Sequence, residues 1–224
     1  MGINDLTAVG ALLGDGTRAE MLGVLLDGRA HTVGELARQA GVAPSTASEH
    51  LGRLLDGGLV TISAQGRHRY YRLAGPEVAA VLEAVDALDR PPSAHRVRAP
   101  SALAYARTCY DHLAGTLGVA LHDGLAATGS LTGTGPALSA AGEALVAGLG
   151  VDPAAVAAGG GRRPFVRTCV DWTERRPHVA GALGAAVLAS LFDRRWLARG
   201  VSSRAVTLTA AGRTGLAAVL GTVP

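Results

Sequence analysis

The stretch 32–60, TVGELARQAGVAPSTASEHLGRLLDGGLV, decides the fold of the first part of the chain. It begins with a Thr and a Glu at the spacing of a capping box, and apolar residues then recur at helical intervals as far as Ala40. Gly41 allows a tight turn, and Pro44 is tolerated at the first position of a second helix. Two short helices joined by such a turn are typical of a helix-turn-helix, whose second helix enters the major groove of DNA.

The second of these helices has two different faces. Its apolar face carries Ala47, Leu51, Leu54 and Leu55 at helical spacing. The opposite face has short polar side chains at its beginning and a basic side chain further along. Such side chains can contact base edges or phosphates. The residues of this helix that we expect to contact DNA are Ser45, Thr46, Ser48, Glu49, His50 and Arg53.

A basic β-hairpin is predicted directly after the second helix. Residues 59–62 and 67–73 have the composition of strands, and the four residues between them form a turn. Arg67 and Arg69, with Tyr70 beside them, are expected to reach phosphates or the minor groove. Two packed helices or a basic hairpin alone would indicate little, but their order within one short stretch favours a winged helix-turn-helix.

The chain resembles the ArsR/SmtB family of bacterial winged-helix repressors over residues 6–90. The matching stretches are ALLGDGTRAEMLGVLL, TVGELARQAGVAPSTASEHLGRLLDGGLV and GRHRYYRL. The resemblance implies a homodimer, in which the first helix and a helix beginning at Gly75-Pro76-Glu77 pack across a two-fold axis. The dimer would place two recognition helices in successive major grooves of a near-palindromic, double-stranded DNA operator.

The metal sites of that family do not carry over to this chain. Residues 33–40 contain no Cys, and residues 76–90 contain no His. These are the places where many members of the family have their metal ligands. We therefore expect any effector to be sensed outside the first domain.

The sequence predicts a mainly α protein with small β-hairpins and two domains. Residues 1–90 form the winged helix-turn-helix domain for DNA binding and dimerisation, and its second helix is expected to have Thr17 as its N-cap. A proline-containing linker covers residues 91–100. Residues 101–224 form an α-helical domain, which we expect to bind an effector.

The second domain contains an internal repeat. Arg-Thr-Cys occurs at 107–109 and again at 167–169, with an Asp two residues after each Cys. HLAGTLGVAL at 112–121 then matches HVAGALGAAV at 178–187. We expect two related helical subunits, each with a helix that begins near the Asp. Their ranges are 101–150 and 161–220.

A metal is one effector that the repeat suggests. Cys-x-x-His in the first copy and Cys-x8-His in the second could together complete a zinc-type site of two sulfurs and two nitrogens. The competing interpretation is that the cysteines are ordinary buried residues and the aspartates ordinary helix caps. The candidate metal ligands are Cys109, Asp111, His112, Cys169, Asp171 and His178.

A thiol redox switch is a second interpretation of the same residues. The duplication places Cys109 and Cys169 in equivalent positions, where a disulfide between them would change the packing of the two subunits. This interpretation requires the two sulfur atoms to lie within bonding distance.

The sequence favours a third interpretation, an organic effector in a cleft between the two subunits. Aromatic residues would line the cleft, and arginines would bind a carboxylate, phosphate or phenolate group. The competing interpretation is that the aromatic residues belong to the core. The residues expected to bind this effector are Tyr105, Arg107, Cys109, Tyr110, Arg167, Cys169, Trp172, Arg175 and Arg176.

An enzyme and a membrane protein are both disfavoured. The sequence has no Gly-rich phosphate loop, GxSxG or HExxH, and a nucleophile such as Cys109 seldom finds its base so near in sequence. No secretory signal or membrane span is visible, so we expect a cytoplasmic protein whose cysteines are thiols. The net charge of +3 does not identify a nucleic-acid-binding half by itself. The prediction is a homodimeric repressor that an effector releases from double-stranded DNA, with a metal or small organic molecule as the only cofactor suggested.

Overall fold

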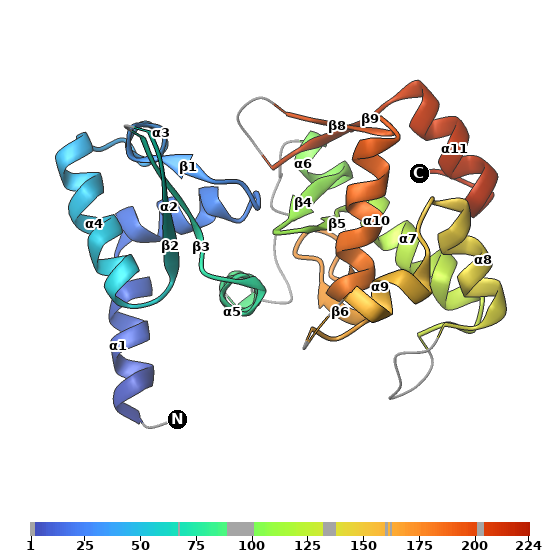
Figure 1. Ribbon diagram of the computed structural model, residues 1–224, viewed down its shortest axis with the longest axis horizontal. Helices are drawn as coiled ribbons and strands as arrows, with labels where there is room; N and C mark the ends of the chain where they lie inside the picture. The colour runs from blue at the N-terminus through green and yellow to red at the C-terminus, as the bar shows by residue number, and fades with distance from the viewer. Residues whose placement is uncertain are drawn as a thin grey trace. The chain divides into compact units, whose positions relative to one another are not determined.

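The computed structural model describes residues 3–66, 68–88, 101–131, 138–159, 161, 163–200 and 204–224. The chain divides into two compact units, Met1–Asp86 and Ala87–Pro224 (Figure 1). The predicted linker 91–100 and the predicted DNA contact Arg67 lie outside the described residues. We describe the two units separately.

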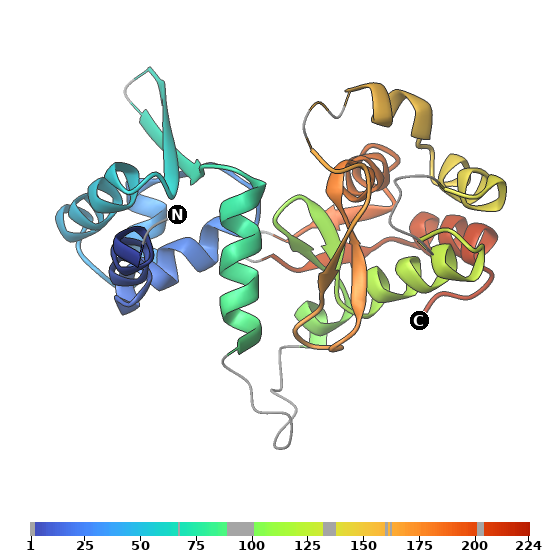
Figure 2. The same ribbon diagram turned by 90° about the horizontal axis from the view of Figure 1, so that it is seen from below.

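The first unit is a winged helix-turn-helix. Its helices are α1 (Ile3–Leu13), α2 (Gly16–Leu25), α3 (Val33–Gln39), α4 (Pro44–Asp56) and α5 (Pro76–Leu88), and its strands are β1 (His31–Thr32), β2 (Val60–Gln65) and β3 (His68–Leu73). The strands form an antiparallel sheet in the order β1-β3-β2. Figure 2 shows the β2–β3 hairpin projecting beyond the helices of this unit. The helices enclose a core whose fully buried members include Met21, Leu25, Leu36, Leu51 and Leu54.

The local signals around the turn explain this arrangement. The backbone N–H of Thr32 donates to Glu35 Oε2 at 2.7 Å, and the backbone N–H of Glu35 donates to the Thr32 hydroxyl, so the predicted capping box opens α3. Gly41 has a φ of +65°, which a glycine adopts at no steric cost, and Pro44 begins α4. The prediction for α2 was wrong in one detail, because Asp15 and not Thr17 is its N-cap. The Asp15 carboxylate accepts from the backbone N–H of Arg18 at 3.0 Å.

The second unit combines helices with three separate two-stranded hairpins, β4-β5, β6-β7 and β8-β9. Its helices are α6 (Ser101–Tyr105), α7 (Thr116–Ala127), α8 (Ala140–Gly148), α9 (Pro153–Gly159), α10 (Gly181–Asp193) and α11 (Ala210–Leu220). Its strands are β4 (Arg107–Cys109), β5 (His112–Ala114), β6 (Arg167–Val170), β7 (Pro177–Ala180), β8 (Leu197–Arg199) and β9 (Val206–Leu208). The core lies between these elements, with Leu117, Leu125, Leu183, Val187 and Leu191 completely buried.

Each Arg-Thr-Cys copy lies on the first strand of a hairpin, and a helix follows each hairpin. The glycines at the two junctions, Gly115 and Gly181, both have a φ of +83°. A Cβ atom at Gly115 would lie 2.7 Å from the carbonyl oxygen of Ala104, and one at Gly181 would lie 2.8 Å from that of Pro164. Only glycine therefore fits at either junction.

The two hairpin–helix segments are interlocked. Helix α7, which follows the β4–β5 hairpin, packs on β7, and α10, which follows the β6–β7 hairpin, packs on β5. The expectation that a helix begins near each Asp was wrong in position. Asp111 lies in the two-residue turn between β4 and β5, and Asp171 directly follows β6. The helices begin only after the return strands.

In the part of the chain that the structure describes, no single helix is long and apolar enough to cross a bilayer. Helices α8 and α9 reach the required length and composition only as a pair, and they are bent by 91°.

Candidate functional sites

Helix α4 presents a polar face opposite its buried side. Ala47, Leu51 and Leu54 are completely buried against the rest of the unit. Among the predicted DNA contacts, Ser45, Ser48, Glu49 and Arg53 are exposed and Thr46 is half-buried. The Arg53 guanidinium donates to Glu49 Oε1 at 2.6 Å across one helical turn. This pair is exposed, so both side chains remain accessible to a ligand.

His50, which we also predicted to contact DNA, instead lies against residues of the first unit. Its Nδ1 atom lies 3.3 Å from the Arg18 guanidinium and 3.5 Å from Asp15 Oδ1. Arg18 also donates to the carbonyl oxygens of Leu12 and Ala11 at 2.7 and 2.8 Å. The imidazole therefore ties α4 to the junction of α1 and α2, and we leave it out of the proposed DNA contacts.

The β2–β3 hairpin carries basic side chains near its tip. Arg69 is opposite Ala64 and is exposed, and Tyr70 is half-buried. Arg72 is also exposed, and we did not include it among the predicted contacts. The alternation of a strand could have identified it, because Tyr71 and Leu73 are buried and the residue between them must point the other way.

The second unit brings two cysteines and two histidines together. In each hairpin a Cys and a His are directly opposite one another, Cys109 with His112 and Cys169 with His178. Strand β5 contacts β7, so the two pairs meet. We call these four residues the Cys-His cluster. Their ligand atoms, one from each residue, all lie within 4.8 Å of one another.

The Cys-His cluster is buried, and its two imidazole rings are stacked. The ring centroids are 5.0 Å apart with an interplanar angle of 23°. Cys109, His112 and His178 are almost completely buried, and Cys169 is half-buried. Neither ring nitrogen of His178 has a hydrogen-bond partner of good geometry among the described residues.

The cluster also shifts the protonation of its members. A hydrogen bond from the Cys109 thiol lowers the pKa of Cys169 to about 2, against the opposing effect of burial, and the two imidazoles contribute in the same direction. Burial lowers the pKa of His178, and the nearby Cys169 sulfur opposes this without reversing it. These directions favour a thiolate at Cys169 and a neutral imidazole at His178, which are the forms that bind metals.

Two aspartates beside the cluster are bound to arginines. Asp111 receives two hydrogen bonds from Arg163, at 2.6 and 3.0 Å, and its Oδ1 lies 3.4 Å from His112 Nδ1. Asp171 accepts from Arg107 at 2.8 Å and from the backbone N–H of Gly115 at 2.6 Å. Because these contacts occupy both carboxylates, we leave Asp111 and Asp171 out of the candidate ligand set.

The donors around these carboxylates outweigh the cost of their burial. Burial alone would raise the pKa of Asp171, but Arg107 and the backbone N–H groups lower it to about 2. Burial would also raise the pKa of Asp111, but the hydrogen bonds of His112 and Arg163 lower it to about 2.

Several residues predicted to bind an organic effector are engaged within the fold. Arg107 is completely buried, and its guanidinium lies 4.6 Å from the ring centroid of Trp172. The Tyr105 hydroxyl donates to the carbonyl oxygen of Pro224 at 2.9 Å, and Arg176 donates to Asp123. Of the other residues in this group, Tyr110 and Cys169 are half-buried, Cys109 is buried, and Arg167 and Arg175 are exposed.

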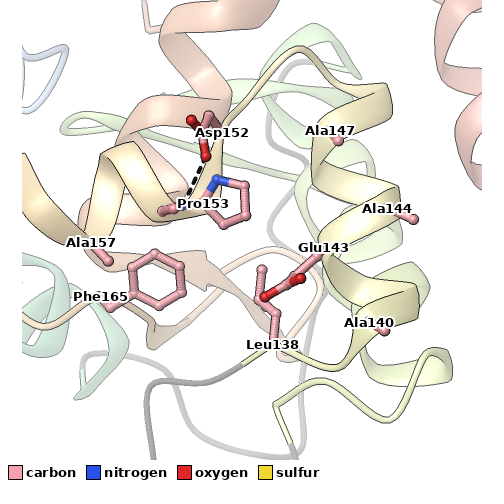
Figure 3. Close-up of a pocket in the computed structure, with 10 residues that line it drawn as sticks. Leu138, Ala140, Glu143, Ala144, Ala147, Asp152, Pro153, Ala157 and Phe165 are labelled. Atoms are coloured by element: carbon pink, nitrogen blue, oxygen red, sulfur yellow. Dashed lines mark hydrogen bonds between the residues drawn. The ribbon is translucent and has the colours of Figure 1, made fainter.

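The second unit also has two open hollows that the Cys-His cluster does not line. One, of about 550 Å³, lies between α8 and α9, and Figure 3 shows Glu143, Pro153 and Phe165 around it. The other, of about 470 Å³, is lined in part by Asp123 and Arg176. Apart from Arg176, the residues predicted to bind an organic effector line neither hollow. Cys109 and Cys169 are not joined by a disulfide in this structure.

Comparisons with known proteins agree with the architecture of the first unit. Residues 13–62 match a family described as a helix-turn-helix domain. Over 214 residues the chain is 37% identical to the uncharacterized HTH-type transcriptional regulator YdfF of Bacillus subtilis, which covers 93% of this chain and 94% of the relative. It is 36% identical over 77 residues to the HTH-type transcriptional regulator Rv0324 of Mycobacterium tuberculosis, about 34% of each chain.

A solved structure is also similar to part of the chain. It is the homodimeric winged helix-turn-helix DNA-binding domain of a possible ArsR-family transcriptional regulator from Mycobacterium bovis. The sequence identity is 32% and the TM-score is 0.39, and the match covers 42% of this chain and 86% of the other.

Proposed function

We propose that this chain, which belongs to the HTH-type transcriptional regulators, is a homodimeric repressor of the ArsR family that reads its operator through α4. The observation that carries the proposal is the exposed polar face of α4, next to a hairpin with exposed arginines. A helix of this kind fits the major groove, and a basic hairpin beside it fits the phosphate backbone.

The proposed contacts divide into two groups by chemistry. Thr46 and Glu49 lie on the first half of α4, where a recognition helix contacts base edges, and a carboxylate can accept a hydrogen bond from cytosine. Arg53 and Arg69 bind phosphates, which increases affinity without selecting a sequence. Ser45 and Ser48 lie on the same end of the helix and can contact either bases or phosphates.

Exposed apolar side chains support the proposed homodimer. Leu6 on α1 is 69% exposed, and Val81 and Val85 on α5 are 48% and 46% exposed. These are the two helices that the family resemblance places at the dimer interface. Packing them against a second copy would remove this apolar surface from water.

Regulation by an effector bound to the second unit completes the proposal. The first unit has no Cys on α3 and no His on α5, so it lacks the ligands that many members of the family use. Binding to the second unit would release the DNA only if the effector had different affinities for the free and DNA-bound forms. The proposed role is non-enzymatic and belongs in the cytoplasm, where the DNA is and where thiols stay reduced.

Selection from a random DNA library by the full-length chain tests the proposal. We expect enrichment of a near-palindromic sequence, bound by two chains, and a changed preference when Glu49 or Thr46 is replaced by Ala. Glu143→Ala is the matched control, since Glu143 is an exposed carboxylate of the second unit. The proposal fails if no sequence is enriched, or if the α4 variants select the same sequence as the unchanged chain.

A further inference from the structure

We propose that the Cys-His cluster binds one Zn²⁺ ion per chain. The cluster offers two sulfurs and two imidazole nitrogens from opposed pairs on two adjacent hairpins. This is one of the ligand sets of structural zinc sites. The inference concerns the second unit alone and does not depend on how the chain regulates transcription.

The size of the cluster fits a tetrahedral ion. Zinc bonds of about 2.3 Å to sulfur and about 2.0 Å to nitrogen imply separations of about 3.3 to 3.8 Å between neighbouring ligand atoms. The four ligand atoms already lie within 4.8 Å of one another. Small rotations of the side chains would therefore bring them to bonding distance.

The framework holds the ligands in place before an ion binds. A two-residue turn places His112 opposite Cys109, and the longer β6–β7 connection places His178 opposite Cys169, so different sequence spacings give the same cross-strand pair. Two glycines of the helices then lie against the imidazoles. A Cβ at Gly184 would be 3.2 Å from the Cβ of His112, and one at Gly118 would be 3.7 Å from that of His178.

The chemistry of the buried groups points to a cation as well. His178 is completely buried, and its ring nitrogens lack good hydrogen-bond partners in the described part of the chain, which costs free energy unless something binds them. Two thiolates would neutralise a divalent ion in this buried site. Asp111 lies next to His112 Nδ1 and is held by Arg163, an arrangement typical of the carboxylates that orient metal-binding histidines.

The ligand set selects zinc over other ions. Magnesium and calcium prefer oxygen ligands, and the carboxylates nearest the cluster are already bound to arginines. A trivalent metalloid usually takes three thiolates, and the cluster has two. Two sulfurs and two nitrogens in a tetrahedral arrangement are typical of zinc.

Titration of the chelator-treated, reduced, full-length chain with Co²⁺ and then Zn²⁺ tests the site. Cobalt serves as a coloured substitute for zinc. We expect the visible absorption of tetrahedral Co²⁺ together with sulfur-to-cobalt charge transfer at one ion per chain, and loss of both signals when Zn²⁺ is added. Zinc should also protect both thiols from alkylation, counted by mass spectrometry. A spectrum without the charge-transfer band, or thiols that react equally with and without Zn²⁺, would overturn the proposal.

Variants locate the bound ion. Cys169→Ser and His178→Gln should each weaken Zn²⁺ binding by more than about 100-fold, because even the loss of an outer-shell partner costs about 10- to 100-fold. His122→Gln is the matched control, since His122 lies in the same unit outside the cluster. Circular dichroism establishes whether each variant is folded, and the cobalt spectrum of the unchanged chain needs no variant. Zinc binding that survives in a folded Cys169→Ser chain would contradict the assignment.

Discussion

Two charged pairs, one in each unit of the molecule, have opposite environments. Glu49 and Arg53 form a pair on α4 in which the side chains are 65% and 56% exposed, whereas Arg107 and Asp171 form a pair that is 0–1% exposed. An exposed pair contributes little to stability and remains available to a partner. A buried pair contributes little beyond a well-packed apolar pair, but breaking it leaves an uncompensated charge. The Glu49–Arg53 pair is thus available to a ligand, whereas the Arg107–Asp171 pair holds the frame of the second unit.

The largest effect should follow from breaking the buried pair. Arg107→Ala leaves the Asp171 carboxylate buried without its guanidinium partner, and we expect a loss of about 3–5 kcal/mol in the free energy of unfolding. Both tryptophans, Trp172 and Trp196, lie in the second unit, so denaturant unfolding followed by tryptophan fluorescence measures this loss.

Arg53→Ala is the control for the buried pair. It removes an exposed partner and should change stability by less than about 1 kcal/mol. Similar losses for the two arginine variants would remove the distinction between the two pairs.

The next largest effect should come from replacing a helix glycine by alanine, and it should differ between the two units. A Cβ at Gly184 would lie 2.5 Å from the carbonyl oxygen of Val179, so Gly184→Ala must displace β7 or α10, at a cost of about 1–3 kcal/mol. The matched change in the first unit is Gly23→Ala in α2, where a Cβ would meet nothing within 4 Å. There we expect stabilisation of up to about 1 kcal/mol, because alanine is the better helix former. Thermal unfolding by circular dichroism compares the two, and equal shifts would contradict the close packing at Gly184.

A smaller effect concerns the capping box of α3. Hydrogen bonds from the Thr32 backbone and hydroxyl lower the pKa of Glu35. A lowered pKa means that the carboxylate stabilises the fold above its unfolded-state pKa of about 4.3 and that this contribution is lost as the pH falls through the lower native pKa. Glu35→Ala should therefore cost about 1 kcal/mol at neutral pH. The cost should decrease in acid, and an unchanged difference at pH 3 and pH 7 would count against the ionised cap.

The smallest effect is on the salt dependence of DNA binding. Arg69→Ala removes one proposed phosphate contact, so the slope of log affinity against log salt should fall by about 1 and affinity should drop similarly for all sequences. Arg213→Ala on α11 is the control, since Arg213 is an exposed arginine of the other unit. An unchanged slope for Arg69→Ala would move the phosphate contacts away from this part of the hairpin.

The sequence was sufficient to predict the fold of the first unit because the signals that determine this fold are local. The capping box, the turn glycine and the proline of α4 each act within a few residues, and the predicted helix-turn-helix and hairpin are confirmed. The N-cap of α2 was mistaken because Asp15 and Thr17 are both good caps only two residues apart, and only the backbone conformation selects between them.

The arrangement of the second unit could not be predicted in the same way, because it depends on contacts between residues that are far apart in the sequence. The Cys and His spacings suggested a metal site, but the opposition of each pair arises from the register of short hairpins, whose return strands we had expected to lie in helices. The interlocking of α7 with β7 and α10 with β5 is a long-range contact, and it brings the two pairs together. Asp111 and Asp171 were named as ligands because no local pattern revealed their arginine partners.

Native mass spectrometry of the full-length chain with its selected DNA duplex and Zn²⁺ tests the whole account most directly, because one spectrum reports on both units. The account predicts two chains on each duplex, with one zinc ion per chain that a strong chelator removes. A single chain on the duplex would contradict the proposed homodimer. Chains without zinc, or chains two hydrogens lighter because the cysteines have formed a disulfide, would contradict the proposed metal site.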